Sequence, residues 1–287
     1  MNVLFATILV LVGLQSTAQS LTVVAQDFQK AKTIAAQEGK LIFIDFYTTW
    51  CLPCKELDKW VFGDSLTTNK LAPDFVLLKY NAEDDTVFHL SKKYHINSYP
   101  TGLVLNPEGY VVNRKYGFSG DDSLELNKNV IAFAKASREN HQQKKIWKGY
   151  SNAVDASQYP AFYSGYVNRT KKEINNTKEF LEYWNKKQDR FSESYFSPLA
   201  YFAHEVPEHA ANDFLQHKEQ YATLYGAPVV DVVLFFLTDG IFSQAFTKKD
   251  KRMYERAKIF SRKALDAEFA QSIIDENQKK WDKQIKK

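Results

Sequence analysis

Two cysteines, the only ones in 287 residues, constrain this chain most, because they follow an apolar segment closely. The segment 41–47 reads Leu-Ile-Phe-Ile-Asp-Phe-Tyr and has the length and the β-branched and aromatic content of a strand covered on both faces. Cys51 and Cys54 come shortly after it. Beyond them, apolar residues recur with the spacing of one helix face at Leu57, Trp60 and Val61. The cysteines therefore belong where a strand gives way to the start of a helix.

A Cys-x-x-Cys spacing serves as a redox dithiol, as half of a zinc site, or as neither. A structural zinc ion needs four ligands, and the sequence has no second Cys-x-x-Cys and no His-x-x-x-His. At a helix N-terminus, unpaired N–H groups and the macrodipole stabilise a thiolate, which is the attacking form of cysteine. We therefore expect an exposed Cys51 to attack substrate disulfides and a deeper Cys54 to resolve the mixed disulfide. Zinc binding and an inert pair are the alternatives.

Further motifs lie in a fixed order around the cysteines: Asp45-Phe46-Tyr47 before Trp50-Cys51, then Lys79-Tyr80-Asn81 at the end of a second apolar segment, then Tyr99-Pro100-Thr101, and finally Gly117. On these motifs, the stretch from about Ala25 to Asn140 resembles thioredoxin, and most of all the exported thioredoxin-like proteins of bacterial cell envelopes. The Leu52-Pro53 dipeptide between the cysteines differs from the Gly-Pro commonest in that family. This difference leaves the direction of electron flow open.

The resemblance assigns roles to residues outside the dithiol. It implies that Asp45 is the buried acid that takes the proton of Cys54 during resolution. A carboxylate in an apolar strand is costly, so we expect its pKa to be raised. Lys79 is then the matching charge partner. The alternatives are a strand-end carboxylate that reaches solvent and an ordinary exposed lysine.

The resemblance also implies a cis peptide bond between Tyr99 and Pro100, beside the dithiol, where the backbone of residue 99 pairs with an extended substrate. X-Pro bonds are cis in only about 5–6% of folded cases, so the resemblance alone carries this expectation. Trp50 and Tyr99 would form an apolar lip around Cys51. The alternative is that both aromatic rings serve only in packing.

Helices and strands alternate in the first half of the chain and close with a hairpin, whose turn contains Pro107 and Gly109. This pattern predicts an α/β fold in which helices cover both faces of a sheet, and the resemblance makes it the thioredoxin-like fold with a mixed central sheet. We expect strands at 41–47, 75–80, 101–105 and 110–115. We expect helices that begin at Phe28, after the cysteines, around Val87, Leu90 and Tyr94, and after a cap at Asp121 or Asp122.

After about His141 strand-like segments nearly vanish, which predicts a second, mainly helical domain. Segment 229–236 is expected as a buried helix, with a strand as the alternative. Leu265, Phe269 and Ile273 are expected on one helix face, and three prolines at helix ends: Pro198, Pro207 and Pro228. A helical-repeat solenoid is a further alternative. The predicted organisation is a signal peptide at 1–18, a thioredoxin-like domain at 19–142 and a helical domain at 143–287.

Residues 3–14 are almost uninterrupted apolar sequence, too short to cross a bilayer and typical of a secretory signal. Ser16 and Ala18 supply small residues for cleavage. The alternative is a buried N-terminal strand or helix. No later segment is expected to span a membrane, because the apolar run 229–237 is short and contains Asp231. We therefore predict an exported protein, in the periplasm, with secretion as the alternative.

The formal net charge is only +4 and the basic residues are spread along the chain, so nothing favours nucleic acid as a partner. No cofactor and no metal are expected. The sequence predicts a thiol:disulfide oxidoreductase that reduces protein disulfides of the cell envelope, with electrons from a separate membrane-bound donor. One alternative is a disulfide isomerase or oxidase with the same site. Another is a binding or chaperone-like protein whose helical domain carries the function.

Overall fold

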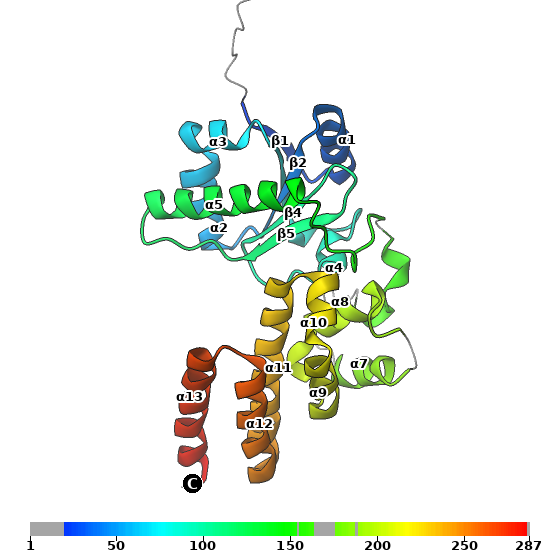
Figure 1. The fold of residues 1–287 in the computed structure, drawn as a ribbon, viewed down its shortest axis with the longest axis vertical. Helices are drawn as coiled ribbons and strands as arrows, with labels where there is room; N and C mark the ends of the chain where they lie inside the picture. The colour runs from blue at the N-terminus through cyan, green and yellow to red at the C-terminus, as the bar shows by residue number, and fades with distance from the viewer. Residues whose placement is uncertain (1–19, 154, 164–175, 187–188, 286–287) are drawn as a thin grey trace, which may run out of the picture.

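The computed structural model describes residues 20–153, 155–163, 176–186 and 189–285, which leaves the predicted signal peptide outside the described residues. A sheet with its own helices forms one part of the molecule, and a set of helices lies against one side of it (Figure 1). We call residues 143–285 the helical region. The sheet part carries both cysteines.

The sheet is mixed, as predicted. It is built from β1 (Thr22–Ala25), β2 (Leu41–Tyr47), β3 (Phe75–Asn81), β4 (Thr101–Leu105) and β5 (Val111–Tyr116), in the order β1-β3-β2-β4-β5. The first three strands run parallel, and β4 is antiparallel to both of its neighbours. The predicted hairpin is confirmed. The sequence interpretation missed β1, which is only four residues long.

Alternation along the strands sends side chains to two different cores. Ile42, Ile44 and Phe46 contribute to the core that includes α1 (Phe28–Glu38), whereas Leu41 and Phe43 face the opposite side. That second face is covered by α2 (Leu52–Leu57), the π-helical turn η1 (Asp58–Phe62), α3 (Ser65–Leu71) and α5 (Ser123–Gln142). Asp122 caps α5, as expected, by accepting the N–H of Glu125. By the same alternation, Asp45 and Lys79 belong to the face of the cysteine-bearing helix.

The helix expected around Val87, Leu90 and Tyr94 is shorter than predicted. Only α4 (Leu90–Lys93) is helical, and Val87 is exposed. The carboxylate of Asp85 accepts the N–H groups of Leu90 and Ser91, at 3.0 and 2.7 Å. These bonds satisfy two N–H groups that a helix start leaves unpaired, so α4 begins there. The 3₁₀ turn η2 (Ala82–Asp84) lies just before it.

The prediction that the chain is mainly helical after about His141 is confirmed. The helical region contains α7 (Asn176–Trp184), α8 (Glu193–Tyr201), α9 (Glu208–Gln216), α10 (Lys218–Tyr225), α11 (Ala227–Lys248), α12 (Lys251–Ala264) and α13 (Ala267–Ile285), with 3₁₀ turns η3 (Ala156–Gln158) and η4 (Ala203–Glu205). Segment 229–236 lies inside α11, so the strand alternative is wrong. Pro207 and Pro228 lie at helix starts, as expected. Pro198 lies inside α8, so its predicted role is wrong.

The face predicted for the last helix is wrong in part. Leu265 lies between α12 and α13 and Phe269 is exposed, although Leu265 and Ile273 do pack against the core. The apolar residues that α13 buries fully are Ala270, Ile274 and Trp281. Trp281 stacks on Tyr254 of α12 with ring centroids 4.5 Å apart. The large indole ring sets which face of α13 turns inward, and it lies outside the window in which the pattern was counted.

Helix α11 is longer than the apolar run that predicted it, with 22 residues. By length and composition alone it could cross a bilayer, but 56% of its most apolar window is buried inside the structure, as in the core helix of a soluble protein. Its buried residues include Val233, Leu237 and Ile241.

The two parts of the chain share a continuous apolar core. Residues of the α1 face of the sheet, such as Phe46 and Tyr80, belong to one cluster with Tyr150 and Phe196 of the helical region. One backbone contact joins the two parts directly: Val111 of β5 pairs with Trp147 as an isolated bridge. The helical region therefore packs directly on the sheet part through a shared apolar core.

Candidate redox site

Cys51 lies at the N-cap of α2, and its Sγ accepts the N–H of Cys54 at 3.2 Å. The two cysteines form a disulfide with Cα atoms 5.3 Å apart. Pro53 lies in the first turn, where a helix needs no N–H donor. The predicted position of the pair at the start of a helix is confirmed. Among the described residues, no group of three or more His, Cys, Asp and Glu could hold a metal ion.

The expected exposure of Cys51 is wrong for this disulfide state. Cys51 is 3% exposed and Cys54 is 1% exposed. The disulfide ties Cys51 to a partner whose side chain lies in the core, and this bond holds its sulfur away from solvent. The neighbouring Trp50 and Leu52 are both exposed. A substrate therefore meets these two apolar side chains around a largely covered sulfur.

Asp45 and Lys79 face each other on neighbouring strands, with Lys79 Nζ 2.5 Å from Asp45 Oδ2. Asp45 is fully buried, and burial raises the pKa of its carboxyl although Lys79 opposes the shift. Its Oδ1 has no hydrogen-bond partner among the described residues. The predicted burial and pairing are confirmed. The alternatives of a solvated carboxylate and an exposed lysine are wrong, because the Lys79 side chain is largely covered as well.

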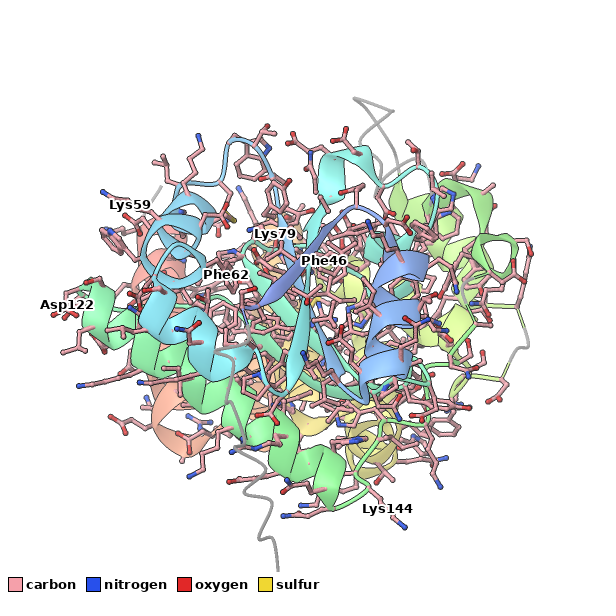
Figure 2. The ribbon with its side chains drawn as sticks, turned by 90° about the horizontal axis from the view of Figure 1, so that it is seen from above. Phe46, Lys59, Phe62, Lys79, Asp122 and Lys144 are labelled. Carbon is pink, nitrogen blue, oxygen red and sulfur yellow. A yellow bond between two sulfur atoms is a disulfide. The ribbon has the colours of Figure 1, made fainter. Side chains whose placement is uncertain are left out.

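A second carboxylate at this site was missed by the sequence interpretation. Asp58, the first residue of η1, is half-exposed and forms an ion pair with Lys79. Burial lowers the pKa of Lys79, but the two carboxylates outweigh it and the pKa is raised. Lys79 Nζ also lies 5.2 Å from the ring centroid of Phe62, and both residues are labelled in Figure 2. The signal available in the sequence was the position of Asp58 four residues after Cys54, one helical turn further on.

The Tyr99–Pro100 bond is cis, as the resemblance implied. Trp50 and Tyr99 meet edge to face with ring centroids 6.0 Å apart, so the predicted aromatic lip is present. The carbonyl of Pro100 accepts the N–H of Gly117 at 2.9 Å, and Gly117 has a left-handed φ of 69°. The strand end at Gly117 therefore holds the backbone of the proline in place.

The loop before the cysteines has one further tie that the sequence did not reveal. Thr49 donates both its N–H and its hydroxyl to Glu83 Oε2, at 2.8 and 2.7 Å. Glu83 belongs to η2, so this contact fixes the loop of Trp50 to the segment that leads toward α4.

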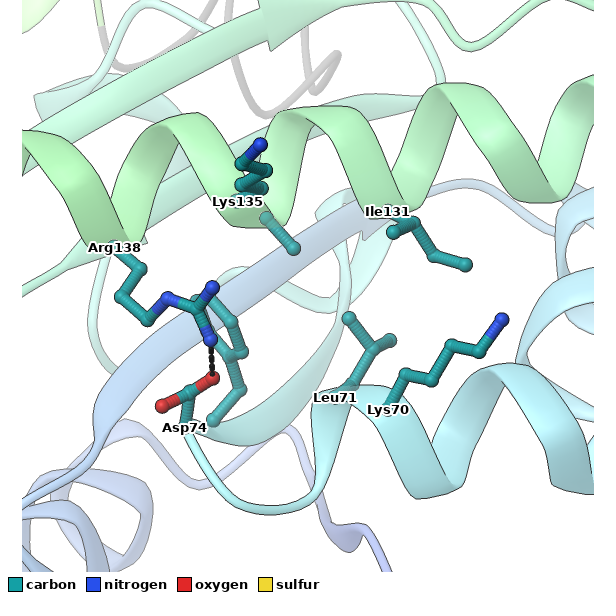
Figure 3. Close-up of a pocket in the computed structure, with 8 residues that line it drawn as sticks. Lys70, Leu71, Asp74, Ile131, Lys135 and Arg138 are labelled. Atoms are coloured by element: carbon teal, nitrogen blue, oxygen red, sulfur yellow. Dashed lines mark hydrogen bonds and ion pairs between the residues drawn. The ribbon is translucent and has the colours of Figure 1, made fainter.

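The described hollows lie away from the dithiol. The one in Figure 3, of about 220 Å³, lies between α3 and α5, where Arg138 donates to Asp74 at 2.7 Å. A neighbouring hollow of about 630 Å³ is lined by Trp60 and Leu124 among others. Neither cysteine lines these hollows.

This geometry agrees with what is found in known proteins. Residues 23–107 match a family model described as thioredoxin-like. Thioredoxin-1 of Drosophila melanogaster is 33% identical over 105 residues, which cover 37% of this chain and 90% of that protein. The chain belongs to the thioredoxin-like family of thiol-disulfide oxidoreductases.

Other thioredoxin-like proteins are similar over a comparable share of this chain. The thiol:disulfide interchange protein DsbD of Pseudoalteromonas atlantica is 28% identical over 110 residues, but these are 37% of this chain and only 18% of that protein. A solution structure of a proposed disulphide isomerase from Bacteroides thetaiotaomicron is 41% identical, covers 40% of this chain and 93% of its own, and has a TM-score of 0.33. Each of these similarities covers 40% of the chain or less.

Proposed function

We propose that this thioredoxin-like protein reduces disulfides of proteins in the cell envelope through a mixed disulfide. The observation that carries the proposal is the pairing of a helix-capping dithiol with a buried carboxylate, Asp45, on the sheet face that the same helix covers. In the reduced protein, the Cys51 thiolate attacks one sulfur of a substrate disulfide. The S–S bond of the substrate breaks, and its other sulfur leaves as a thiolate.

The second half of the reaction uses Cys54 and Asp45. The carboxylate of Asp45 takes the proton of the Cys54 thiol, and the Cys54 thiolate attacks Cys51 Sγ. The mixed disulfide breaks, the substrate leaves as a dithiol, and the protein is left with the disulfide seen in this structure. Lys79 balances the charge of Asp45 while the proton is elsewhere. A group that exchanges a proton near neutral pH needs a raised pKa, which burial gives to Asp45.

The substrate is an extended protein segment that lies across the lip of Trp50 and Tyr99 and pairs with the backbone of residue 99 next to Pro100. Each turnover consumes two electrons, so the dithiol has to be regenerated. We assign this step to a separate, membrane-bound electron donor, and we place the protein outside the cytoplasm, in the periplasm, because residues 1–18 have the pattern of a secretory signal. The similarity to part of DsbD, named for thiol:disulfide interchange, supports this assignment.

Trapping with single cysteine variants tests the roles of the two sulfurs. Cys54→Ser should accumulate covalent complexes with substrate proteins, because the mixed disulfide cannot be resolved, whereas Cys51→Ser should trap none. The complexes are measured on non-reducing gels of envelope extracts. Equal trapping by both variants contradicts the assignment.

The redox potential of the Cys51–Cys54 pair separates reduction from oxidation. A value near about −270 mV, as in thioredoxin, supports a reductant, and a value near about −120 mV supports an oxidant instead. The chaperone-like alternative is tested with the double Cys51→Ser, Cys54→Ser variant, which should lose biological activity if the dithiol carries the function.

A further inference from the structure

The backbone of the short helix α4 is strained at both of its ends. His89 before it and His95 after it both have a left-handed φ, of 50° and 41°. Each such residue without a glycine's freedom costs on the order of 1 kcal/mol or more, and it persists only where surrounding groups fix it. The helix itself has only four residues, too few to hold these two conformations in place. The segment therefore depends on contacts from outside.

Those contacts come from the helical region. The hydroxyl of Tyr163 donates to the carbonyl of Lys92 at 2.7 Å, and the hydroxyl of Ser197 donates to the carbonyl of Lys93 at 2.9 Å. His95 Nε2 lies 2.7 Å from the hydroxyl of Tyr150. All six residues are buried. Side chains distant in sequence thus hold both the carbonyls at the C-terminal end of α4 and the ring of His95 that follows it.

A buried ion pair completes this junction. Glu193, the first residue of α8, places Oε1 2.5 Å from Lys93 Nζ, and the two side chains are only 6% and 2% exposed. The same Oε1 accepts the hydroxyl of Tyr159 at 2.7 Å, and Oε2 accepts the N–H of Ser151 at 2.8 Å. Both carboxylate oxygens are therefore satisfied, and a negative charge at a helix start is favourable.

From α4 the chain runs directly into the substrate loop. Ile96 donates its N–H to the carbonyl of Ser91 at 2.8 Å, which ties the start of the loop to α4. At the other end, Thr101 begins β4 and donates its hydroxyl to the carbonyl of Ser98 at 2.8 Å. Residues 96–100 therefore stretch between two fixed points, the sheet and α4, and Figure 1 shows α4 beside α8 where the two parts of the molecule meet.

We propose that Glu193 is a positioning residue for thiol–disulfide exchange: through Lys93 it fixes α4 and thereby the Tyr99–Pro100 loop that receives the backbone of a protein substrate. The inference rests on the proposed function for its substrate, but not for the placement of the loop. Small disulfides do not need to pair with this loop. Disturbing the Glu193–Lys93 contact should therefore weaken the binding of protein disulfides and spare the reactivity of Cys51.

The test compares Glu193→Gln with Glu208→Gln in the full chain. Glu208 is a matched control, because it is likewise the first residue of a helix of the helical region and pairs with a cation, Arg256. Reduction of insulin and of the small disulfide 5,5′-dithiobis(2-nitrobenzoate) is measured for each. Loss of one charge-assisted contact, about 1.5 kcal/mol, should raise the KM for insulin about tenfold in Glu193→Gln, with kcat and the small-disulfide rate within about twofold. Glu208→Gln should change neither.

Hydrogen exchange of the amides of residues 96–102 gives a readout that needs no activity. We expect exchange about tenfold faster in Glu193→Gln and unchanged in Glu208→Gln. If Glu193→Gln fails to fold, Ser197→Ala removes a single bond to α4 and decides the question with a smaller shift. Unchanged exchange, or equal losses with insulin and the small disulfide, overturns the positioning role. A wild-type protein that reduces neither disulfide overturns the proposed function, and the exchange data still decide the placement of the loop.

Discussion

Among the described residues, two largely buried lysine–carboxylate pairs have the same 2.5 Å separation, but their carboxylates are hydrogen-bonded differently. Lys79 and Asp45 lie in the sheet on the side of the cysteine-bearing helix, whereas Lys93 and Glu193 join α4 to α8. Glu193 accepts bonds at both oxygens, but Asp45 keeps one oxygen without a partner among the described residues. A carboxylate whose two oxygens both accept hydrogen bonds holds its neighbours in a fixed arrangement. A carboxylate with one unpaired oxygen can still bind a proton at that oxygen.

The lysines show the same contrast. Burial lowers the pKa of Lys93, and its single carboxylate does not reverse the shift. Burial also acts on Lys79, but two carboxylates outweigh it and the pKa is raised. The opposite directions of the two pKa shifts therefore go with the number of neighbouring carboxylates, two at Lys79 and one at Lys93.

The largest expected effect is on the free energy of unfolding, and it should differ between the two ion pairs. Lys93→Met leaves the charge of Glu193 buried and should lower the free energy of unfolding by about 3–5 kcal/mol at pH 7. Lys79→Met should cost about half as much or less, because Asp45 can take a proton and Asp58 can turn to water. Urea titrations of the oxidised proteins measure both. Equal losses would show that the two pairs do not differ in the way described.

The next effect is on catalysis. Asp45→Asn removes the proton acceptor, so resolution of the mixed disulfide should slow by about 10²-fold while the first attack by Cys51 is unchanged. The lifetime of a mixed disulfide with a model peptide, followed by rapid quenching, measures resolution alone. Asp74→Asn is the control, because Asp74 pairs with Arg138 at the hollow between α3 and α5. Resolution at the wild-type rate in Asp45→Asn would remove Asp45 from the mechanism.

A third effect is the pH dependence of stability. The unfolded chain releases the proton of Asp45 near pH 4, but the folded protein holds it to higher pH because the pKa is raised. Above pH 4 the folded state therefore binds more protons than the unfolded state, and stability falls as pH rises, by at most about 1.4 kcal/mol per pH unit until the folded pKa is passed. The difference between wild type and Asp45→Asn in urea midpoints from pH 4 to 8 isolates this slope. A difference that is flat, or of opposite sign, contradicts the raised pKa.

The sequence was sufficient where the evidence is local. The length and the β-branched and aromatic content of segment 41–47 placed Asp45 in a buried strand, and the helical spacing after the cysteines placed Cys51 at a helix start. The roles of Lys79 and Pro100 came from the family resemblance, and the structure confirms their positions but leaves their chemistry as a prediction.

The sequence did not predict the contacts between distant segments. Glu193 lies 100 positions from Lys93, and no periodicity relates the two. The length of α4 depends on the carboxylate of Asp85, which a count of apolar residues does not weigh. Asp58 reads as an ordinary exposed helix residue until the strand carrying Lys79 is placed beside it. In each case a polar group gains its role from a partner that only the fold supplies.

The smallest expected effect tests the second carboxylate. Asp58 repels the charge of Asp45 and shares its lysine, and both influences raise the pKa of Asp45. Asp58→Asn should therefore lower that pKa, make Asp45 a weaker proton acceptor and slow resolution by about threefold at pH 7. The acid limb of the pH–rate profile should move to lower pH, because the carboxylate stays ionised further into acid. A shift to higher pH would mean that Asp58 acts chiefly by holding Lys79 in place rather than by its charge, and the contrast between the two lysine pairs would then rest on geometry alone.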